Sequence, residues 1–414
     1  MDLFEKIKHN RGPLGQNADQ FHGYFTFPKL EGPLGPRMLF RGQEKIVWSL
    51  NNYIGLANHR AIREADTAGT EKWGLAYPMG ARMMSGDTTK HEALEDQLAA
   101  YVQKPAGVLV NFGYQAMASA IQCLVDRKDV IVYDSECHAC IMDGMMMTFS
   151  KRFVYQHNDI DSCKKQLERA TRIVEATGGA ILLITEGVFG MDGDQGKLKE
   201  IVALKQSFNF RMLVDDAHGF GVLGATGAGT GEAQNIQGDI DIYFSTFAKS
   251  MASIGAFFAT TKDVAEYLKY NLRSQVFAKS LPMPIVEGNL KRLEMLQTMP
   301  ELRTKLWVNV ERLQSGLKER GFNIGKTNSC VTPVYLDSDI GPAGNLIVDL
   351  RENYHVFCSA VMYPVVPKGI LLLRLIPSAV HTFEDIDETL AAFDAVHQKL
   401  KQGAYDNLDV PSVV

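Results

Sequence analysis

The chain has 414 residues, of which 46% are hydrophobic, so it can bury a large core and is long enough for one large and one smaller domain. Its 43 Lys and Arg residues against 48 Asp and Glu residues give a net charge of −5 and no basic surface, so no nucleic-acid partner is expected. No apolar run approaches the roughly 18 residues of a membrane span, and the first residues lack the apolar core of a secretory signal. We therefore expect a soluble, cytoplasmic protein that can still touch a membrane surface peripherally.

The first part of the chain, residues 1–45, is rich in Gly, Pro and Asn and predicts an N-terminal arm with little core of its own. Short apolar runs then alternate with helical patterns. The runs are almost continuous in Val, Ile, Leu and Phe, as in strands that are buried on both faces. They lie at residues 107–113, 129–134, 179–185, 211–215, 241–245 and 255–260. This alternation predicts an α/β fold in which a mostly parallel central sheet has helices on both faces, within a large domain over residues 46–280.

The pattern changes after the last of these strands. Two long helical stretches follow, and the second begins at Pro300 and ends before Gly321, the usual start and stop residues. Short strands come next, and Thr382 and Asp385 have the spacing of a capping box at the start of a last helix. We expect a smaller C-terminal α+β domain over residues 281–414.

Polar side chains follow the ends of five predicted strands. In a parallel sheet, ligands bind beyond the carboxyl ends of the strands. The residues at these ends include acids, histidines, glycines and one lysine: Asn111, Gly113, Tyr114, Asp134 to His138, Glu186 to Asp192, Asp215 to His218 and Thr246 to Lys249. Residues far apart in the sequence are therefore expected to converge at one edge of the sheet.

Lys249 lies among small and apolar residues, with no acid within four positions. Such surroundings disfavour the charged form, lower the pKa and leave a neutral amine that attacks carbonyls, as a Schiff-base lysine must. The alternative is a lysine whose stem lies on apolar surface while its amine reaches water.

Asp215 and His138 each allow two interpretations. Asp215 ends the apolar run 211–215, where a carboxylate can keep a pyridinium nitrogen protonated or can cap the next helix. His138 can stack on an aromatic cofactor or can be a hydrogen-bonded core histidine. The presence of Lys249, Asp215 and His138 at successive strand ends favours a pyridoxal cofactor more than any one of them does.

Other motifs give weaker indications. Among six scattered cysteines only Cys137 and Cys140 have metal-like spacing, and the second pair that a zinc site needs is missing from the sequence, so we expect free thiols and no metal. The Gly-rich run 224–232 does not directly join a strand to a helix, which makes a dinucleotide site a weak interpretation. The sequence has no G-x-S-x-G elbow, which argues against an α/β-hydrolase.

The strand-end motifs, taken in order, resemble those of the α-oxoamine synthases, which are pyridoxal-phosphate-dependent transferases of fold type I. The similarity is carried by "NNYIGLANH", "GARMMSGDTTKHEALEDQLA", "NFGYQA", "HACIMDG", "EGVFGMDGD", "VDDAHGFGVLGATGAGTGE" and "DIYFSTFAKSMASIGAFFA". These segments occur in the family's order within about residues 45 to 400, and their combination is specific.

The resemblance implies roles around pyridoxal 5′-phosphate. Lys249 would bind it as a Schiff base and later move protons at the substrate Cα, where a tuned pKa is needed. Asp215 would pair with the pyridine nitrogen, His138 would stack on the ring, and His218 would hydrogen-bond its phenolic oxygen. The phosphate would be bound by backbone N–H groups and a hydroxyl, which belong to Gly113, Tyr114 and Thr246.

The resemblance also implies the substrate contacts and the reaction. Arg374 would hold the substrate carboxylate through a bidentate fork, and Asn51 or Asn52 would assist from the arm side. An amino acid would be condensed with an acyl thioester, carried by coenzyme A or an acyl carrier protein, with loss of CO₂. Family members are homodimers with their sites at the subunit interface.

The chain departs from the family pattern at four positions. Ala248 and Gly190 stand where serines are usual, and Ala278 and Lys279 replace a Ser/Thr pair that usually reaches the phosphate of the neighbouring subunit. Lys279 can compensate at that phosphate, bind a substrate with an extra negative charge, or form a surface ion pair.

The substrate is the least defined part of the prediction. The contexts "FAKSLPMP" and "DSECHACIMDG" are closest to the long-chain members of the family, and "YPVVPKG" at residues 363–369 lacks the arginine of serine palmitoyltransferases. Cysteate, a sulfonate, is therefore favoured over serine. The alternatives are a short-chain synthase (aminoketobutyrate ligase or aminooxononanoate synthase), an aminotransferase and an inactive partner subunit, against which the presence of Lys249 argues. Two methionine groups can line an acyl channel or fill the core: Met79, Met83 and Met84, and Met142 with Met145, Met146 and Met147.

Overall fold

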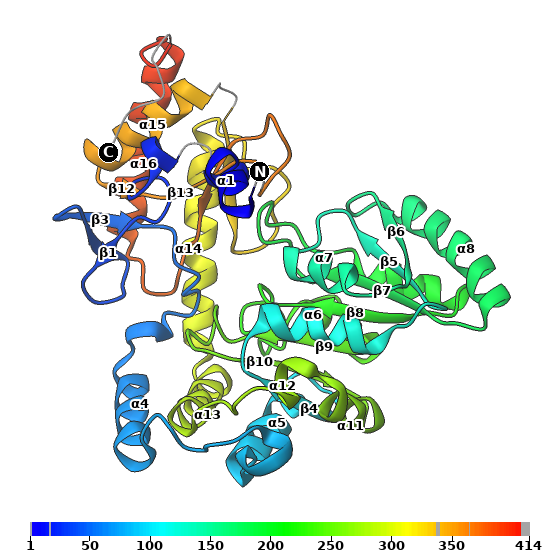
Figure 1. Cartoon of the computed structure of the whole chain (residues 1–414). Coiled ribbons are helices and arrows are strands. Elements are labelled where there is room, and N and C mark those ends of the chain that lie inside the picture. Colours follow the sequence, from blue (N-terminus) through cyan, green and yellow to red (C-terminus); the bar gives the residue numbers. More distant parts are fainter. Residues whose placement is uncertain (1, 16–17, 337–339, 364, 407–414) are drawn as a thin grey trace. The chain divides into compact units, whose positions relative to one another are not determined.

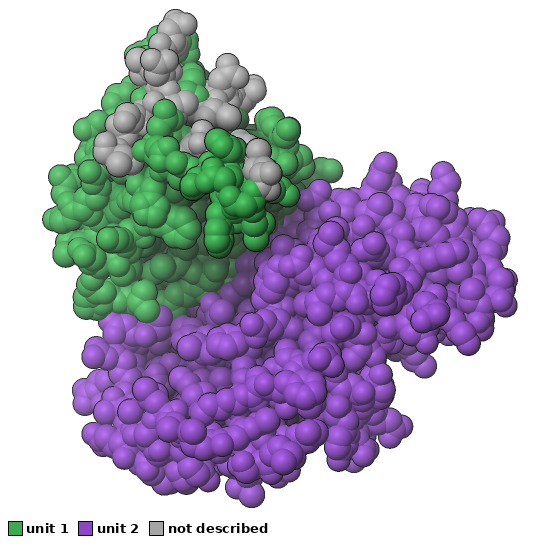
Figure 2. All heavy atoms as spheres, in the orientation of Figure 1, with its two compact units in different colours: residues 1–53, 191–193, 304–414 green, residues 54–190, 194–303 purple. Residues whose placement is uncertain are grey.

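A computed structural model describes residues 2–15, 18–336, 340–363 and 365–406. The chain forms two compact units (Figure 2). Unit 1 contains residues 1–53, 191–193 and 304–414, and unit 2 contains residues 54–190 and 194–303. Each unit is described by itself.

Unit 2 is built on a seven-stranded sheet with the order β4-β10-β9-β8-β7-β5-β6. The strands are β4 (Ala106–Val110), β5 (Val130–Asp134), β6 (Lys151–Tyr155), β7 (Ile181–Glu186), β8 (Arg211–Asp215), β9 (Ile242–Thr246) and β10 (Ala256–Thr260). Only β10 runs antiparallel to its two neighbours, so the predicted, mostly parallel sheet is confirmed. Strand β6 was not predicted, because this edge strand is largely exposed and begins with two charged residues.

The strand ends that carry the predicted site are aligned. Asp215, the last residue of β8, pairs with Glu186 on one side and with Phe244 on the other. Ala256 opens β10 and pairs with both Val110 and Thr246, the last residues of β4 and β9. The carboxyl ends of β4, β7, β8 and β9 therefore meet at one edge of the sheet.

Helices pack around this sheet (Figure 1). They are α4 (Arg60–Trp73), α5 (Thr89–Tyr101), α6 (Gly113–Leu124), α7 (Ala139–Met146), α8 (Ile160–Thr177), α9 (Leu198–Ala203), α10 (Thr230–Ala233), α11 (Lys262–Asn271), α12 (Arg273–Val276) and α13 (Met283–Thr298). Shorter turns are η1 (Leu56–Asn58), the π-helical η2 (Arg82–Gly86), η3 (Leu204–Gln206) and η4 (Gln237–Asp239). One apolar core joins α6 and α7 to the central strands through buried side chains that include Met117, Ile121, Ile141, Ile131, Ile184, Leu213 and Phe244.

Unit 1 contains two small sheets, β1-β2-β3-β12 and β11-β14-β13. Their strands are β1 (Leu30–Glu31), β2 (Arg37–Phe40), β3 (Gln43–Val47), β11 (Thr332–Tyr335), β12 (Val356–Phe357), β13 (Ser359–Val361) and β14 (Leu372–Leu375). The helices are α1 (Leu3–His9), α2 (Gly12–Gly15), α3 (Ala18–Phe21), α14 (Pro300–Glu319), α15 (Ile340–Glu352) and α16 (Phe383–Lys401), with α14 beginning in unit 2. Its core gathers Trp48, Leu313, Leu346, Leu373 and Phe393.

These units differ from the three successive segments expected from the sequence. The arm joins the C-terminal residues because β3 pairs in parallel with β12, with Ile46 opposite Val356. Helix α13 belongs to unit 2, where it packs on α4 and α5. Such long-range pairings leave no mark on local composition.

Two helix boundaries were foreseen from the sequence. The helix predicted to begin at Pro300 is α14. The predicted capping box opens α16, where the Asp385 N–H donates to Thr382 Oγ1 at 3.2 Å and the Thr382 N–H donates to Asp385 Oδ2 at 2.9 Å. Within the described residues, no helix is both long and apolar enough to cross a bilayer.

Candidate active site

Lys249 lies in a tight turn between β9 and β10. The Ser253 N–H donates to the Phe247 carbonyl, and the Ala252 N–H donates to the Lys249 carbonyl at 2.8 Å. Phe247, Ser250 and Met251 are buried, whereas Lys249 is half-buried. The turn therefore holds the lysine backbone firmly at the carboxyl edge of the sheet.

Asp215 is buried near this lysine. Its Oδ1 accepts a hydrogen bond from the Ala217 N–H at 3.1 Å. Burial raises the pKa of Asp215, and Lys249 and His138 lie near enough to oppose the rise when they are protonated. The structure thus brings together the three residues that the sequence analysis placed at successive strand ends.

His138 is the N-cap of α7. The His138 Nδ1 atom accepts a hydrogen bond from the Cys140 N–H at 3.2 Å. The backbone N–H of His138 donates to Glu186 Oε1 at 2.5 Å. An acceptor nitrogen requires the neutral imidazole, in agreement with the lowering of the His138 pKa by burial. His138 is exposed, and the Tyr114 ring lies edge-on to it with the ring centroids 6.0 Å apart.

His218 is buried against Gly190. A Cβ atom built on Gly190 would lie 2.4 Å from His218 Nε2, closer than any real contact. The absence of a side chain at position 190 therefore lets the imidazole lie where it does. Gly190, which stands where a serine is usual in the family, therefore has a structural consequence for His218.

The first turn of α6 and Thr246 form a cradle. Helix α6 begins at Gly113, and its N-cap Phe112 provides no side-chain hydrogen bond. The first N–H groups of a helix have no acceptor within it and favour an anion. A Cβ atom on Gly113 would lie 3.2 Å from both Cβ and Oγ1 of Thr246, so only glycine leaves this space open without crowding Thr246. Tyr114 follows with its hydroxyl bonded to Asp143, which raises the pKa of Tyr114 to about 12.

Lys279 is exposed, and its backbone lies beside the segment that leads into α6. Its carbonyl accepts a hydrogen bond from Asn111 Nδ2 at 2.5 Å, and the next N–H, of Ser280, donates to the Gly80 carbonyl at 2.8 Å. Among the residues that the structure describes, none forms a hydrogen bond or ion pair with the Lys279 ammonium group. The surface ion pair that the sequence left open is therefore not formed within the described chain.

Three of the four predicted substrate residues lie in unit 1, and the fourth, Lys279, lies in unit 2. Arg374, in β14, is buried, and its Nη1 donates to Asn51 Oδ1 at 3.2 Å. Asn52 is also buried. The N–H groups of a guanidinium have the geometry to donate to both oxygens of a carboxylate.

Sequence reasoning left Glu186 without a role, although it noted the strand end. Glu186 is buried beside Asp215 in the sheet and accepts the His138 N–H. Burial raises the pKa of Glu186 well above its usual value, with the Asp215 charge adding to the rise. Its position at the end of an apolar strand, as for Asp215, was the available signal.

His157 was also missed. Its Nδ1 lies 2.9 Å from Asp134 Oδ1, and its Nε2 lies 2.9 Å from Asp194 Oδ2. Burial alone would lower the pKa of His157, but the hydrogen bonds to both carboxylates outweigh it and raise the pKa to about 10. A charged imidazolium therefore joins the end of β5 to the loop that follows β7.

Several other sequence features have structural explanations. The Gly-rich run 224–232 wraps the Glu232 carboxylate, which accepts the N–H groups of Thr226 and Ala228. The described cysteines form no disulfide, and the described residues contain no group of three metal-binding side chains. Met145 fills the core, whereas the other methionines of both groups are at least 37% exposed.

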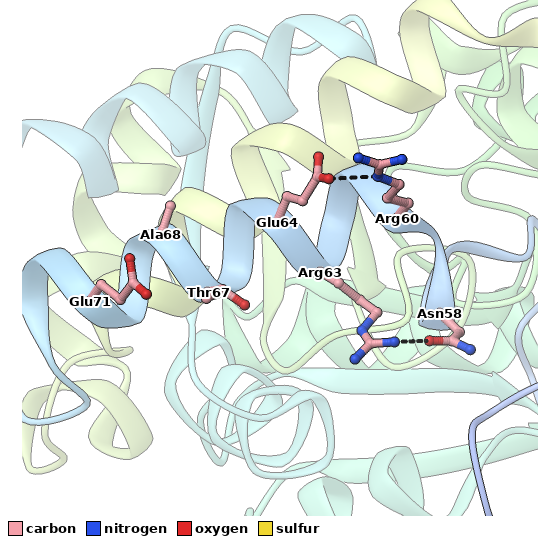
Figure 3. Close-up of a pocket in the computed structure, with 7 residues that line it drawn as sticks. All are labelled: Asn58, Arg60, Arg63, Glu64, Thr67, Ala68 and Glu71. Atoms are coloured by element: carbon pink, nitrogen blue, oxygen red, sulfur yellow. Dashed lines mark hydrogen bonds and ion pairs between the residues drawn. The ribbon is translucent and has the colours of Figure 1, made fainter.

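An open cavity of about 500 Å³ lies on the surface of α4 (Figure 3). Figure 3 shows Arg60 paired with Glu64 and Arg63 bonded to Asn58. The lining residues are Asn58, Arg60, Arg63, Glu64, Thr67, Ala68 and Glu71. They include none of the predicted site residues.

Comparison with known proteins places these features in context. The family model of class I and II aminotransferases matches residues 43–393. A cysteate-C-fatty acyltransferase of Capnocytophaga ochracea is 61% identical over 404 residues, covering 98% of this chain and 96% of that protein. An 8-amino-7-oxononanoate synthase of Thermoanaerobacter pseudethanolicus is 37% identical, covering 91% of this chain and 94% of that protein. Among solved structures, a serine palmitoyltransferase from S. paucimobilis with bound PLP–myriocin aldimine has a TM-score of 0.89 and 27% identity, covering 97% of this chain and 100% of that one.

Proposed function

Because the chain belongs to the pyridoxal-phosphate-dependent α-oxoamine synthases within the class I and II aminotransferase family, we propose that it condenses L-cysteate with a long-chain acyl thioester. Release of the free thiol of the acyl carrier and of CO₂ would then give a 3-keto long-chain amine that carries a sulfonate, in the first step of sulfonolipid synthesis. The 61% identity to a cysteate-C-fatty acyltransferase, over nearly the whole of both chains, is the observation that carries this proposal.

The residues of unit 2 fit pyridoxal phosphate. The cradle of Gly113 and Thr246 offers uncapped N–H groups and a hydroxyl to a phosphate, with space that a Cβ atom would crowd. Asp215, a buried carboxylate at the end of β8, suits a protonated ring nitrogen. When bound, the cofactor supplies an electron sink for the negative charge that develops at the Cα atom of the amino acid.

The chain's own groups then have separate tasks. The Lys249 amine anchors the cofactor covalently and afterwards takes a proton from Cα and returns one to it. Asp215, kept ionised by its cationic partner, holds the proton on the ring nitrogen. His138 covers one ring surface as a neutral imidazole, and His218 donates to the phenolic oxygen.

Arg374 and Asn51 are proposed to bind the substrate carboxylate. Their mutual hydrogen bond orients the guanidinium before the substrate arrives, which lowers the conformational cost of binding. Two features of the sequence also favour cysteate: the segment 363–369 contains no arginine, and the ammonium of Lys279 is available for an additional anion. Residue 364, in this segment, lies outside the described residues.

A homodimer is part of the proposal. The exposed apolar side chains of unit 2 include Phe112, the N-cap of α6, and also Met146 and Phe277, at 55%, 73% and 74%. A second copy of the chain or the acyl chain of the thioester would remove this surface from water.

The test is a substrate matrix. Purified protein with pyridoxal phosphate is offered cysteate, serine, glycine and alanine, each with long and short acyl groups on coenzyme A and on acyl carrier protein, and the products are weighed. We expect the cysteate-derived long-chain 3-keto amine with stoichiometric release of CO₂. A serine-derived product would assign the chain to sphingolipid synthesis, a short-chain product would favour the aminooxononanoate synthase alternative, and amino-group exchange with a keto acid would indicate an aminotransferase.

A further inference from the structure

Asp216, the residue after Asp215, has a fully buried side chain whose hydrogen-bond donors are all neutral. Its Oδ2 accepts the Thr230 N–H at 2.8 Å and the Tyr243 hydroxyl at 3.0 Å, and its Oδ1 accepts the Thr230 hydroxyl at 2.6 Å. Burial raises the pKa of Asp216 to about 7. Burying a carboxylate costs free energy unless hydrogen bonds compensate for it, so the hydrogen bonds of Asp216 indicate what this buried side chain does.

Glycines make room for this carboxylate on several sides. A Cβ atom would lie 1.9 Å from an Asp216 oxygen if built on Gly187 or Gly229, and 2.1 Å from one if built on Gly219. Gly187 follows β7, Gly219 follows His218, and Gly229 precedes α10. The carboxylate therefore occupies a closely fitting space at which three separate segments meet.

The backbone of Asp216 is fixed as well. Its N–H donates to the Phe244 carbonyl in β9 at 2.8 Å, and its carbonyl accepts the N–H groups of Gly219 and Phe220 at 3.1 and 2.9 Å. The last two bonds close a turn that contains His218. The strands β8 and β9 that frame this turn are neighbours in the sheet (Figure 1).

We propose that Asp216 is a positioning residue: by joining the start of the loop 216–230 to its end at Thr230 and to Tyr243, it fixes the directions of Asp215 and His218 toward the cofactor. The role belongs to the hydrogen bonds of Asp216 and not to its charge. The inference rests on the proposed assignment of Asp215 and His218 to the cofactor ring.

Helix α10, which follows this loop, contains a matched control. Glu232 also accepts three bonds from neutral groups of the loop, the N–H groups of Thr226 and Ala228 and the Thr226 hydroxyl, but lies at the far end of the Gly-rich run. D216A and E232A therefore remove similar sets of bonds from one loop, and only the first removes bonds beside the cofactor residues.

The experiment uses full-length protein and three measurements. These are the melting temperature of the cofactor-free protein, the dissociation constant of pyridoxal phosphate and the pH titration of its visible absorbance band. We expect both D216A and E232A to melt earlier, and only D216A to raise the dissociation constant at least tenfold and to shift the titration. D216N should stay within threefold of the parent protein, because its amide oxygen keeps the Thr230 N–H and Tyr243 hydroxyl bonds while its nitrogen can donate to the Thr230 hydroxyl oxygen.

Other results overturn the inference. If D216A binds the cofactor as tightly as E232A does, Asp216 is only a folding residue; if D216N is as weak as D216A, its charge matters and its hydrogen bonds do not suffice. Should D216A fail to fold, T230V, which removes one donor, must raise the dissociation constant at least threefold. D215A distinguishes failure of the cofactor assignment from failure of the role of Asp216. An unchanged visible band in D215A would refute the cofactor assignment itself. A changed band in D215A with an unchanged band in D216A would refute only the role of Asp216.

Discussion

The backbone N–H of His138 donates to Glu186 Oε1, and through this bond the end of β7 fixes the start of α7. We expect E186A to leave that N–H without its partner and to lower the free energy of unfolding by about 1 kcal/mol, the usual net contribution of one hydrogen bond. E186Q keeps an acceptor oxygen and should stay close to the parent protein. Urea unfolding of the three proteins checks this, and equal stability of E186A and the parent would contradict it.

Replacing Lys249 tests the covalent anchor. Borohydride reduction of the parent protein with pyridoxal phosphate should add the cofactor's mass to the peptide that contains Lys249, because the Lys249 amine is proposed to condense with the aldehyde. K249A should show no such addition and no catalytic turnover, while K262A, at an exposed lysine, should behave like the parent. A parent protein that stays colourless with pyridoxal phosphate would refute the assignment.

Arg374 should dominate binding of the amino acid. R374A is expected to weaken that binding by roughly 2–5 kcal/mol, the range for removing one partner of a buried, hydrogen-bonded charge pair. R312A is the control, because Arg312 is an exposed arginine in an ion pair with Asp387. Titration of the visible band with cysteate gives both dissociation constants, and an unchanged value in R374A would remove Arg374 from the site.

Adding one methyl group at Gly190 should disturb His218. In G190A the new carbon would lie 2.4 Å from His218 Nε2, so the imidazole must move. We expect a shifted absorbance maximum and at least a fivefold lower affinity for pyridoxal phosphate. The matched control is G238A, where a Cβ atom meets nothing within 4 Å. Identical spectra for both variants would show that the ring position does not depend on residue 190.

His157 should make stability depend on pH. Its pKa is raised from 6.5 to about 10 in the folded protein, so its contribution is complete below pH 6.5, where the unfolded chain also binds the proton. The contribution falls as the pH rises from 6.5 through 10, because only the folded protein then holds the proton. At pH 7 the free energy of unfolding of H157Q should be roughly 2–4 kcal/mol below that of the parent protein. Between pH 6.5 and 10 this free energy should fall less in H157Q than in the parent. Urea unfolding at pH 6, 8 and 10 measures the slopes, and parallel slopes would contradict the assignment.

The sequence predicted the convergence of Lys249, Asp215 and His138, because the carboxyl ends of parallel strands must share an edge. It did not predict the roles of Glu186 and Asp216, because these depend on which strand lies beside which and on the donors that reach each carboxylate. Local composition cannot contain that information. Strand β6 was missed for a related reason: an exposed edge strand needs no apolar run.

The methionines illustrate a second limit. Periodicity could not separate Met145, which is buried in the core, from Met146, its neighbour, which is 73% exposed. A thioether carries no charge, so its side of the helix is decided by packing alone. Helix α7 packs on α6, the preceding helix in the chain, and the sequence does not show which side of α7 faces it.

The pairing of β3 with β12 has a consequence during synthesis of the chain. The segment 43–47 leaves the ribosome about three hundred residues before its partner strand, so the small sheet of unit 1 cannot be completed until translation is almost finished. Unit 2, whose strands all lie between residues 106 and 260, can assemble in the meantime. Nascent chains stopped near residue 310 should therefore resist protease over the central region while their first fifty residues are still digested.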